Sequence, residues 1–326
     1  MQYHDRLYGA VEIGESVLID LMRTVAMERL RGVLQHGITA VIGITHPTTR
    51  FEHSVGVMLL ARRLGAPLKE QVAALLHDVS HTAFSHVIDY VFGGHDRQSY
   101  HETIKEAYMA GTDLPAILAR HGYDWRDFLH EEDYPLLEQP SPALCADRLD
   151  YFLRDSRDLG LATDDDIENG LQHLVVHEGR IAVDDLPVAR WMGYTYIAAD
   201  RASWANFREV GLYELAARAI QTGLRAGVIG EADLWGTDES LWARLRAGED
   251  AALQGQLQLI SPRTRFFWDE DAPTFRVSTK LRTIDPDVVI DGHGQPLSAR
   301  DPGFARHRAE YLNGKQGQWP MRVVAD

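Results

Sequence analysis

The sequence predicts a mostly α-helical protein with a small β-hairpin and an α+β region in its last hundred residues. Three observations predict this fold class. Apolar residues such as Val17 and Leu21 recur at helical spacing in segment 15–36 and in the segments that follow it. Two short β-branched runs flank a Glu178-Gly179 turn. The strand-like runs TFRVST and DVVI come late in the chain, after residue 270.

The first half of the chain is expected to form a series of helices. Residues 37–50 are rich in glycine, threonine and proline and are expected to be a loop. Pro67 opens a helix whose VAALLH run is almost wholly apolar, so this helix is expected to be buried. The expected helices cover 15–36, 51–64, a segment that opens at Pro67, 83–92, 98–110, 114–121 and 141–158.

The second half changes character. HLVVHEGRIAVD, at 173–184, predicts a hairpin, and residues 186–225 return to a helical pattern. A soft boundary is expected near residue 230, in GVIGEADLWG. It would separate a helical core, 1–230, from a C-terminal α+β region, 231–326, whose role the sequence does not indicate.

Composition is typical of a globular protein. Hydrophobic residues make up 45% of the chain and charged residues 25%, so disorder is not expected. No apolar run approaches the roughly 18 residues of a transmembrane helix, and MQYHDRLYGA lacks the pattern of a secretory signal. Cys145 is the only cysteine, which excludes an internal disulfide and favours a cytoplasmic location.

The net charge of −15 disfavours binding to nucleic acid or to anionic membranes, and neither partner is predicted. The acidic runs 164–166 and 269–271 are interpreted as solvated loop faces. An anionic substrate would therefore need a local positive centre. A bound cation together with a few arginines could supply one.

Residues able to bind a metal or to move a proton gather between Thr49 and His101. His77 and Asp78 end the apolar helix, where this pair is costly to bury unless it is paired or metal-bound. His53 lies 24 residues before His77 on a helix that a short loop would fold back antiparallel, which can bring it beside the pair. The gathered residues are His53, His77, Asp78, His81, His86, Asp89 and His101.

Asp147 opens the segment DRLDYFLRD and completes a candidate set of metal ligands with His53, His77 and Asp78. Two imidazoles and two carboxylates suit one divalent ion among Mn, Fe, Co, Ni, Zn and Mg. Such a set leaves positions open for water and substrate. A metal of this kind lowers the pKa of its water to about 7 and so yields hydroxide at neutral pH.

The spacing alone leaves other interpretations open. Core histidines often satisfy ordinary hydrogen bonds, and an isolated His-Asp dipeptide carries little information. His77 and His81, four residues apart, could also form a separate zinc pair, although the H-E-x-x-H glutamate is missing.

Three ordered motifs resemble the HD superfamily, and within it the deoxynucleoside triphosphate triphosphohydrolases, including the sterile-alpha-motif-and-HD enzyme. Residues 49–57, TRFEHSVGV, resemble the family's R-F-E-H-S-x-G-V. Residues 76–86, LHDVSHTAFSH, resemble H-D-x-G-H-x-P-F-S-H, and residues 147–155, DRLDYFLRD, resemble D-[KR]-x-D-Y-x-x-R-D. With weaker similarity elsewhere, the resemblance spans about the first two-thirds of the chain. It implies an HD-domain helical core.

The resemblance also implies residue roles. His53, His77, Asp78 and Asp147 fall on metal positions. His86 falls on the catalytic histidine and Asp89 on its partner, a pairing expected to raise the imidazole pKa and to favour a proton donor. Further active-site histidines fall at His81 and His101, and substrate-contacting positions fall at Arg50, Gln35, Arg148 and Tyr151. Without the motifs, a salt-bridge or packing role would be favoured for Arg50, Arg148 and Tyr151.

Four departures from the family pattern affect substrate selection more than hydrolysis. Ser80 and Ala83 replace a glycine and a proline, and both changes are interpreted as structural. The sugar-contacting Gln-Leu-Gly reads Gln35-His36-Gly37. A sugar- or base-stacking tyrosine is not evident in 204–209, and the regulatory D-P-x-H-G element reads DRLYG at 5–9.

The expected function is metal-dependent hydrolysis of a small phosphate substrate, with deoxynucleoside triphosphates as first candidates. Phosphoryl transfer of this kind depends mainly on positioning and electrostatics. The family attacks the α-phosphorus and releases nucleoside and triphosphate. A phosphomonoesterase or phosphodiesterase is one alternative, and a non-catalytic nucleotide-binding module is another. By resemblance, a homo-oligomer is also expected.

Overall fold

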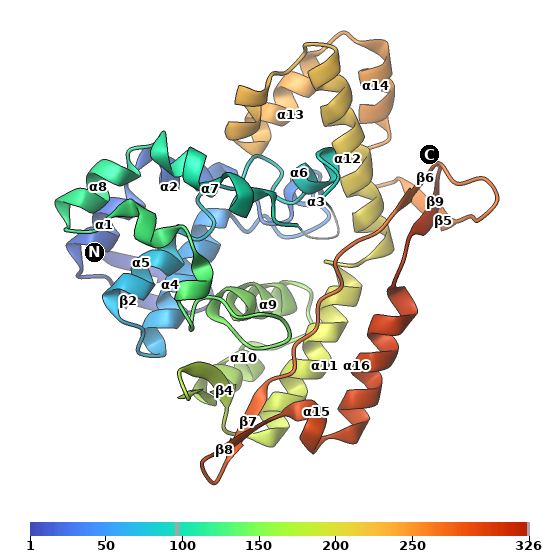
Figure 1. The fold of residues 1–326 in the computed structure, drawn as a ribbon. Coiled ribbons are helices and arrows are strands. Elements are labelled where there is room, and N and C mark those ends of the chain that lie inside the picture. The colour runs from blue at the N-terminus through green and yellow to red at the C-terminus, as the bar shows by residue number, and fades with distance from the viewer. Residues whose placement is uncertain (95–97, 325–326) are drawn as a thin grey trace.

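The computed structural model describes residues 1–94 and 98–324. Helices dominate it, as predicted, and three small sheets complete it (Figure 1). Helices in the first part are α1 Ser16–Met22, α2 Val25–Arg29, α3 Gly37–Val41, α4 Arg50–Arg63, α5 Leu68–Leu76, α6 Val87–Val91, α7 Tyr100–Ala110, α8 Leu114–Arg120, α9 Ala146–Asp158 and α10 Asp164–Gln172. Later helices are α11 Leu186–Ala202, α12 Phe207–Arg225, α13 Asp238–Ala247, α14 Ala251–Gln258, α15 Leu297–Arg300 and α16 Pro302–Lys315.

The sheets join strands from distant parts of the chain. The predicted hairpin is confirmed as β3 and β4, and β7 adds to it in parallel through the pair Val183 and Val288. TFRVST and DVVI contain β6 and β7, as predicted. The strands are β1 Gln2–Asp5, β2 Gly9–Glu12, β3 Leu174–His177, β4 Arg180–Val183, β5 Arg265–Trp268, β6 Phe275–Val277, β7 Asp287–Ile290, β8 His293–Pro296 and β9 Trp319–Val324.

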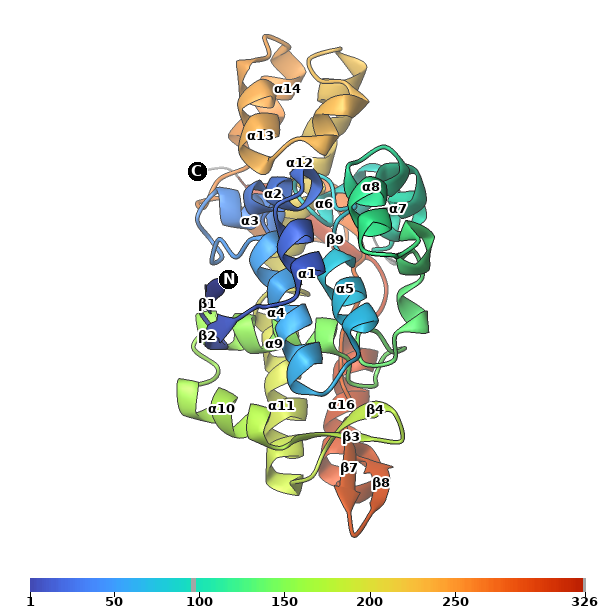
Figure 2. The same ribbon diagram turned by 90° about the vertical axis from the view of Figure 1, so that its left-hand side faces the viewer.

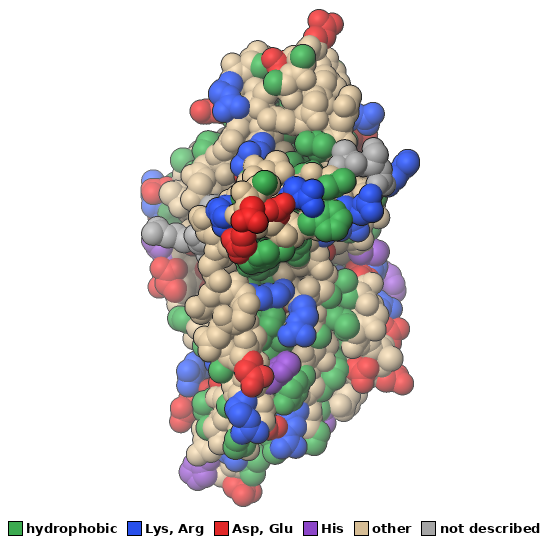
Figure 3. All heavy atoms as spheres, turned by 90° about the vertical axis from the view of Figure 1, so that its right-hand side faces the viewer, with side chains coloured by type: hydrophobic (Ala, Val, Ile, Leu, Met, Phe, Trp, Pro, Cys, Tyr) green, Lys and Arg blue, Asp and Glu red, His purple; other side chains and the backbone are tan. Residues whose placement is uncertain are grey.

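Two hydrophobic cores organise these elements. The first includes buried side chains of α1, α4, α5, α9 and α11, and the second surrounds α12 with α6, α13, α14 and two C-terminal strands. Helices α11 and α16, which both contribute buried side chains to the first core, run side by side (Figures 1 and 2). On the face shown in Figure 3, acidic, basic and apolar side chains are interspersed. The proposed division of the chain near residue 230 stays a prediction.

Several predicted boundaries were wrong for local reasons. The expected helix 15–36 breaks at Thr24, whose hydroxyl donates to Leu21 O and accepts from Met27 N to start α2. The expected loop 37–50 contains α3. The expected helix 186–225 divides where the Asn206 side chain caps α12. When apolar residues recur without interruption, the sequence pattern does not show where such a cap divides one helix from the next.

Two further corrections concern polar segments. Residues 164–166 are the first turn of α10, because Thr163 and Asp166 form a capping box; acidic residues are favoured at a helix N-terminus by its dipole. The N-terminal hairpin, β1–β2, was not expected from the sequence. Among the described helices, none combines the length and the apolar character that crossing a bilayer requires.

Candidate metal centre and active-site cavity

Three helices bring the candidate metal ligands together. A capping box formed by Thr49 and Glu52 starts α4, and His53 lies in its first turn. α5 packs against α4 and ends at His77, with Asp78 next in the chain. α9 packs against the other side of α4 and carries Asp147 in its first turn. Each ligand thus comes from a helix end, where the backbone is fixed by capping or by packing.

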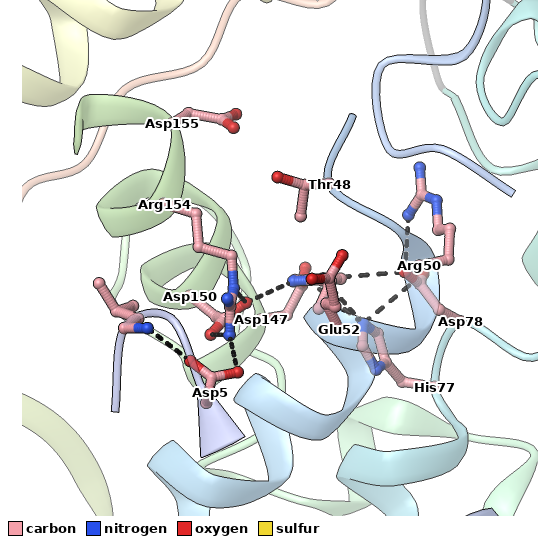
Figure 4. Close-up of polar contacts among 12 residues, drawn as sticks. Asp5, Thr48, Arg50, Glu52, His77, Asp78, Asp147, Asp150, Arg154 and Asp155 are labelled. Atoms are coloured by element: carbon pink, nitrogen blue, oxygen red, sulfur yellow. Dashed lines mark hydrogen bonds and ion pairs between the residues drawn. The ribbon is translucent and has the colours of Figure 1, made fainter. Parts of the chain in front are cut away.

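The ligand atoms of His53, His77 and Asp147 lie within 4.8 Å of one another. Asp147 Oδ1 is 2.9 Å from His53 Nε2 and 3.4 Å from His77 Nε2. Asp78 is slightly farther, with its carboxylate oxygens 3.7 Å from His53 Nε2 and 3.6 Å from His77 Nε2. Figure 4 shows His77, Asp78 and Asp147 converging on one point.

The hydrogen bonds of the two imidazoles fit a cation at that point. His77 Nδ1 donates to Ala74 O at 2.8 Å, and His53 Nδ1 donates to Asp150 Oδ2 at 2.8 Å. Because each Nδ1 carries a proton in these bonds, each Nε2 is the nitrogen that can bind a cation. The two Nε2 atoms are only 3.3 Å apart, and two lone pairs at this distance repel unless a cation or a proton lies between them.

Charge in the centre is balanced among buried groups. Burial disfavours the charged imidazoles, but hydrogen bonds to Asp147 and Asp150 raise the pKa of His53. Asp78 raises the pKa of His77 to about 10 against the same burial effect. Burial alone would raise the pKa of Asp78, but Arg50 and His77 hold it well below its usual range. The centre therefore holds carboxylates that a cation would complement.

A second group of histidines lies beside Asp78. His81 Nε2 is 3.1 Å from Asp78 Oδ1, and the His81 and His101 rings stack with centroids 3.9 Å apart. Asp78, His81 and His101 form another group whose ligand atoms could hold a metal. Burial lowers the pKa of His81 to about 3 and also lowers that of His101. Burial therefore disfavours the charged form of both imidazoles.

His86 and Asp89 pair as the sequence suggested, but two expectations were wrong, the start of the helix and the direction of the His86 pKa shift. The expected helix 83–92 begins only at Val87, because Phe84 and Ser85 adopt positive φ angles of 61° and 48°. His86 Nδ1 then lies 3.1 Å from Asp89 Oδ2. The pKa of His86 is nevertheless lowered, because burial outweighs the hydrogen bond to Asp89. The expectation had counted the carboxylate without the cost of burying the charged ring.

All four predicted substrate-contacting residues line one cavity of about 250 Å³ with the histidines. Arg50 pairs with Asp78 at 2.7 Å, and the Tyr151 hydroxyl contacts that of Tyr196. Arg148 is held by Glu138 at 3.2 Å and by the Ala143 carbonyl at 2.7 Å. The Gln35 side-chain oxygen is buried without a hydrogen-bond partner.

The cavity has a wall that the sequence analysis missed. Lys280 and Arg282 reach it from the C-terminal region, and Glu102, Glu131 and Glu138 face the same space. The Arg282 backbone N–H donates to Asp200 at 3.0 Å, which ties this segment to α11. No sequence spacing links residues 280–282 to the motifs of α4, α5 and α9, so only the tertiary structure reveals them.

His36, the departure in the Gln-His-Gly segment, is buried beside Asp155 at 3.0 Å. Burial opposes its charge, but Asp155, with help from Glu209 and against Arg50, raises the His36 pKa to about 9. This pKa exceeds the value of about 6.5 expected in the unfolded chain. The protonated His36 therefore stabilises the fold fully below about pH 6.5, and this contribution is lost as the pH rises to about 9.

We expect the free energy of unfolding to fall by about 3 kcal/mol more in the wild-type protein than in His36→Gln over that pH range. Urea denaturation at a series of pH values measures both. Parallel pH profiles for the two proteins would show that His36 is not protonated in the folded state.

The residues around this centre match the family model described as the HD domain, over residues 50–155. The metal-dependent phosphohydrolase cns2 of Cordyceps militaris is 38% identical over 317 residues, covering 94% of this chain and 91% of that protein. The chain therefore belongs to the HD-domain phosphohydrolase superfamily. Its membership and its donor set confirm the expected divalent metal cofactor without identifying the metal.

More distant relatives extend the comparison. Deoxynucleoside triphosphate triphosphohydrolase SAMHD1 of Gallus gallus is 28% identical over 211 residues, which cover 49% of this chain and 34% of that protein. A phosphohydrolase structure from Bacteroides thetaiotaomicron covers 100% of both chains with a TM-score of 0.70 at 17% identity. At 17% identity, the similarity to the Bacteroides thetaiotaomicron structure shows a shared fold and nothing more.

Proposed function

We propose that this chain is a metal-dependent phosphohydrolase that acts on a nucleotide in the cavity beside His53, His77, Asp78 and Asp147. The observation that carries the proposal is the convergence of two imidazole nitrogens and two carboxylates in a cavity that is also lined by His86, the partner of Asp89. Metal-dependent phosphohydrolase cns2 is similar over nearly the whole chain, and the nucleotide class rests on the weaker similarity to SAMHD1.

In the proposed mechanism, these four residues would hold a divalent cation, which would supply Lewis acidity toward the phosphoryl group and toward the attacking water. The water oxygen bonds to phosphorus while the P–O bond to the leaving group breaks, and the proton that the water loses passes to a phosphoryl oxygen of the product. His86, oriented by Asp89, gives its Nε2 proton to the departing oxygen. A bound phosphate favours the protonated ring that this step needs, since its negative charge opposes the effect of burial.

Charge in the cavity also supports a second candidate, the hydrolysis of a phosphomonoester. The basic side chains among the described lining residues are Arg50, Arg148, Lys280 and Arg282. Arg50 and Arg148 are already paired with Asp78 and Glu138. Four glutamates line the cavity, namely Glu102, Glu131, Glu138 and Glu209. Burial together with Glu131 raises the pKa of Glu102 to about 7. A monophosphate brings less negative charge into this acidic wall than a triphosphate.

A substrate panel tests the proposal. Purified protein, supplemented in turn with Mn²⁺, Fe²⁺, Co²⁺, Ni²⁺, Zn²⁺ and Mg²⁺, is incubated with nucleoside mono-, di- and triphosphates, a cyclic nucleotide and an aryl phosphate, and products are identified. We expect nucleotide hydrolysis. Triphosphate release assigns the triphosphohydrolase activity, and orthophosphate release from a monophosphate assigns the second candidate. Hydrolysis of the aryl phosphate without any nucleotide, or no turnover at all, would contradict the proposal.

A further inference from the structure

The N-terminal hairpin reaches the metal centre through a line of buried charged side chains. Asp5, at the end of β1, contacts Arg154, which contacts Asp150, and Asp150 contacts His53. Their exposed fractions are 2% for Asp5, 2% for Arg154, 0% for Asp150 and 1% for His53. Figure 4 shows the Asp5–Arg154–Asp150 part of this line. The hairpin lies far from the HD motifs in sequence, yet it shares a hydrogen-bond network with a proposed metal ligand.

Both oxygens of each carboxylate in this line, Asp5 and Asp150, accept hydrogen bonds. Asp5 Oδ1 accepts from the Leu7 and Tyr8 backbone N–H groups at 2.7 and 3.1 Å, which shapes the hairpin turn. Asp5 Oδ2 accepts from Arg154 Nη2 at 2.8 Å. Arg154 donates to both oxygens of Asp150, at 2.8 and 3.1 Å, and the Tyr8 hydroxyl donates to Asp150 Oδ1 at 2.9 Å. The hairpin thus holds Asp150 twice, directly and through Arg154.

Close packing of α4 against α9 fixes the positions of the side chains in this network. Gly56 of α4 faces it, and a Cβ at this position would lie 2.1 Å from Arg154 Nη2 and 2.2 Å from Asp150 Oδ1. The backbone of α4 therefore approaches α9 as closely as a glycine permits. His53, one turn earlier in α4, is placed against Asp150 by the same approach.

The state of Asp150 determines which nitrogen of His53 is free. Asp150 is a carboxylate that accepts from Arg154 and Tyr8, so it can only accept from His53 as well. His53 Nδ1 therefore carries a proton, and Nε2, which lies 2.9 Å from Asp147 Oδ1, is the nitrogen left to bind a metal. Outer hydrogen bonds of this kind set the tautomer and the basicity of metal-binding histidines.

We propose that the β1–β2 hairpin is a positioning element of the metal centre, in which Tyr8 directly and Asp5 through Arg154 hold Asp150 so that His53 presents Nε2 to the metal. The inference rests on the proposed ligand role of His53. The DRLYG segment departs from the family's regulatory element. The proposed role assigns this segment to the support of the metal centre. Asp5 and Tyr8 are positioning residues and touch neither metal nor substrate.

Metal affinity of the apo protein tests this role without any substrate. Tyr8→Phe removes the hydroxyl bond to Asp150 and keeps the ring, which lies 5.7 Å from the Arg154 guanidinium. Asp150→Asn lets an amide N–H donate to His53 Nδ1 and so moves the proton to Nε2. In competition titrations with Mn²⁺ and a chelator, we expect Asp150→Asn to weaken binding by about 10–100-fold. Tyr8→Phe should weaken it less, in the same direction, and Tyr3→Phe in the same hairpin should leave it unchanged.

The His53 tautomer provides a readout that a purely structural network would not move. In ¹⁵N-histidine NMR spectra of the protein loaded with diamagnetic Zn²⁺, we expect His53 to carry its proton on Nδ1 and to bind the metal through Nε2 in the wild type, and we expect this pattern to be lost in Asp150→Asn. If Asp150→Asn does not fold, Tyr8→Phe decides by its metal affinity. Variants that lose thermal stability but keep the wild-type affinity and tautomer would overturn the inference. Failure of the proposed function is distinguishable, because a chain that binds metal through this network but hydrolyses nothing would contradict only the activity.

Discussion

Replacing His77 with alanine is expected to remove the bound metal and the phosphohydrolase activity together. His77 Nε2 lies 3.3 Å from His53 Nε2 and 3.4 Å from Asp147 Oδ1, so its loss removes one of two imidazole donors. We expect the metal content of the purified variant to fall from about one ion per chain to near zero, since catalytic sites of this type use few protein ligands. Elemental analysis and the substrate panel measure the two losses.

Asp78→Asn applies the same test to a carboxylate ligand, with little change in side-chain volume. We expect this variant to lose metal and activity together as well. A matched control is His121→Ala, because His121 is partly exposed, hydrogen-bonds to Asp20 and lies outside the cavity. The control should keep both metal and activity. A His77→Ala protein that is folded by circular dichroism and still carries stoichiometric metal would refute the ligand assignment.

Removal of His86 should have the second largest effect, and the metal should stay. His86 lines the cavity and is oriented by Asp89 at 3.1 Å, while the Asp89 carboxylate is itself fixed by the Tyr100 backbone N–H at 3.0 Å. If His86 protonates the leaving oxygen, His86→Ala should lower kcat by about 10²–10⁴-fold for a nucleotide. Steady-state kinetics on the metal-loaded variant measures this loss.

The leaving group separates proton donation from a general structural defect. An aryl phosphate with an acidic phenol leaves without protonation, so His86→Ala should lose much less activity with that substrate than with an alkyl ester. Asp89→Asn should show the same pattern with a smaller loss. Equal losses on both substrates, or normal turnover on the nucleotide, would remove the proposed role of His86.

The motifs of the centre could be placed from the sequence because their chemistry is local to helix ends. His77 and Asp78 close an apolar helix, and a buried imidazole and carboxylate there need partners. The structure brings them to His53 and Asp147 as the antiparallel packing of α4 and α5 suggested. Asp78 additionally pairs with Arg50, an ion pair between a proposed ligand and a proposed substrate contact that spacing does not reveal.

Long-range contacts set the limit of the sequence analysis. Asp5 and Arg154 are 149 positions apart, and Lys280 and Arg282 come from beyond the proposed boundary. The direction of the His86 pKa also escaped prediction, because it depends on how deeply the ring is buried. Local motifs determine which residues can bind a metal, whereas packing determines the charge and shape of the cavity that selects a substrate.

Anomalous diffraction from crystals grown with Mn²⁺ tests the metal centre most directly. We expect an anomalous-difference peak within bonding distance of His53 Nε2, His77 Nε2 and carboxylate oxygens of Asp78 and Asp147. A peak elsewhere, or an ordered centre in which these four side chains bond only to one another at saturating Mn²⁺, would contradict this expectation.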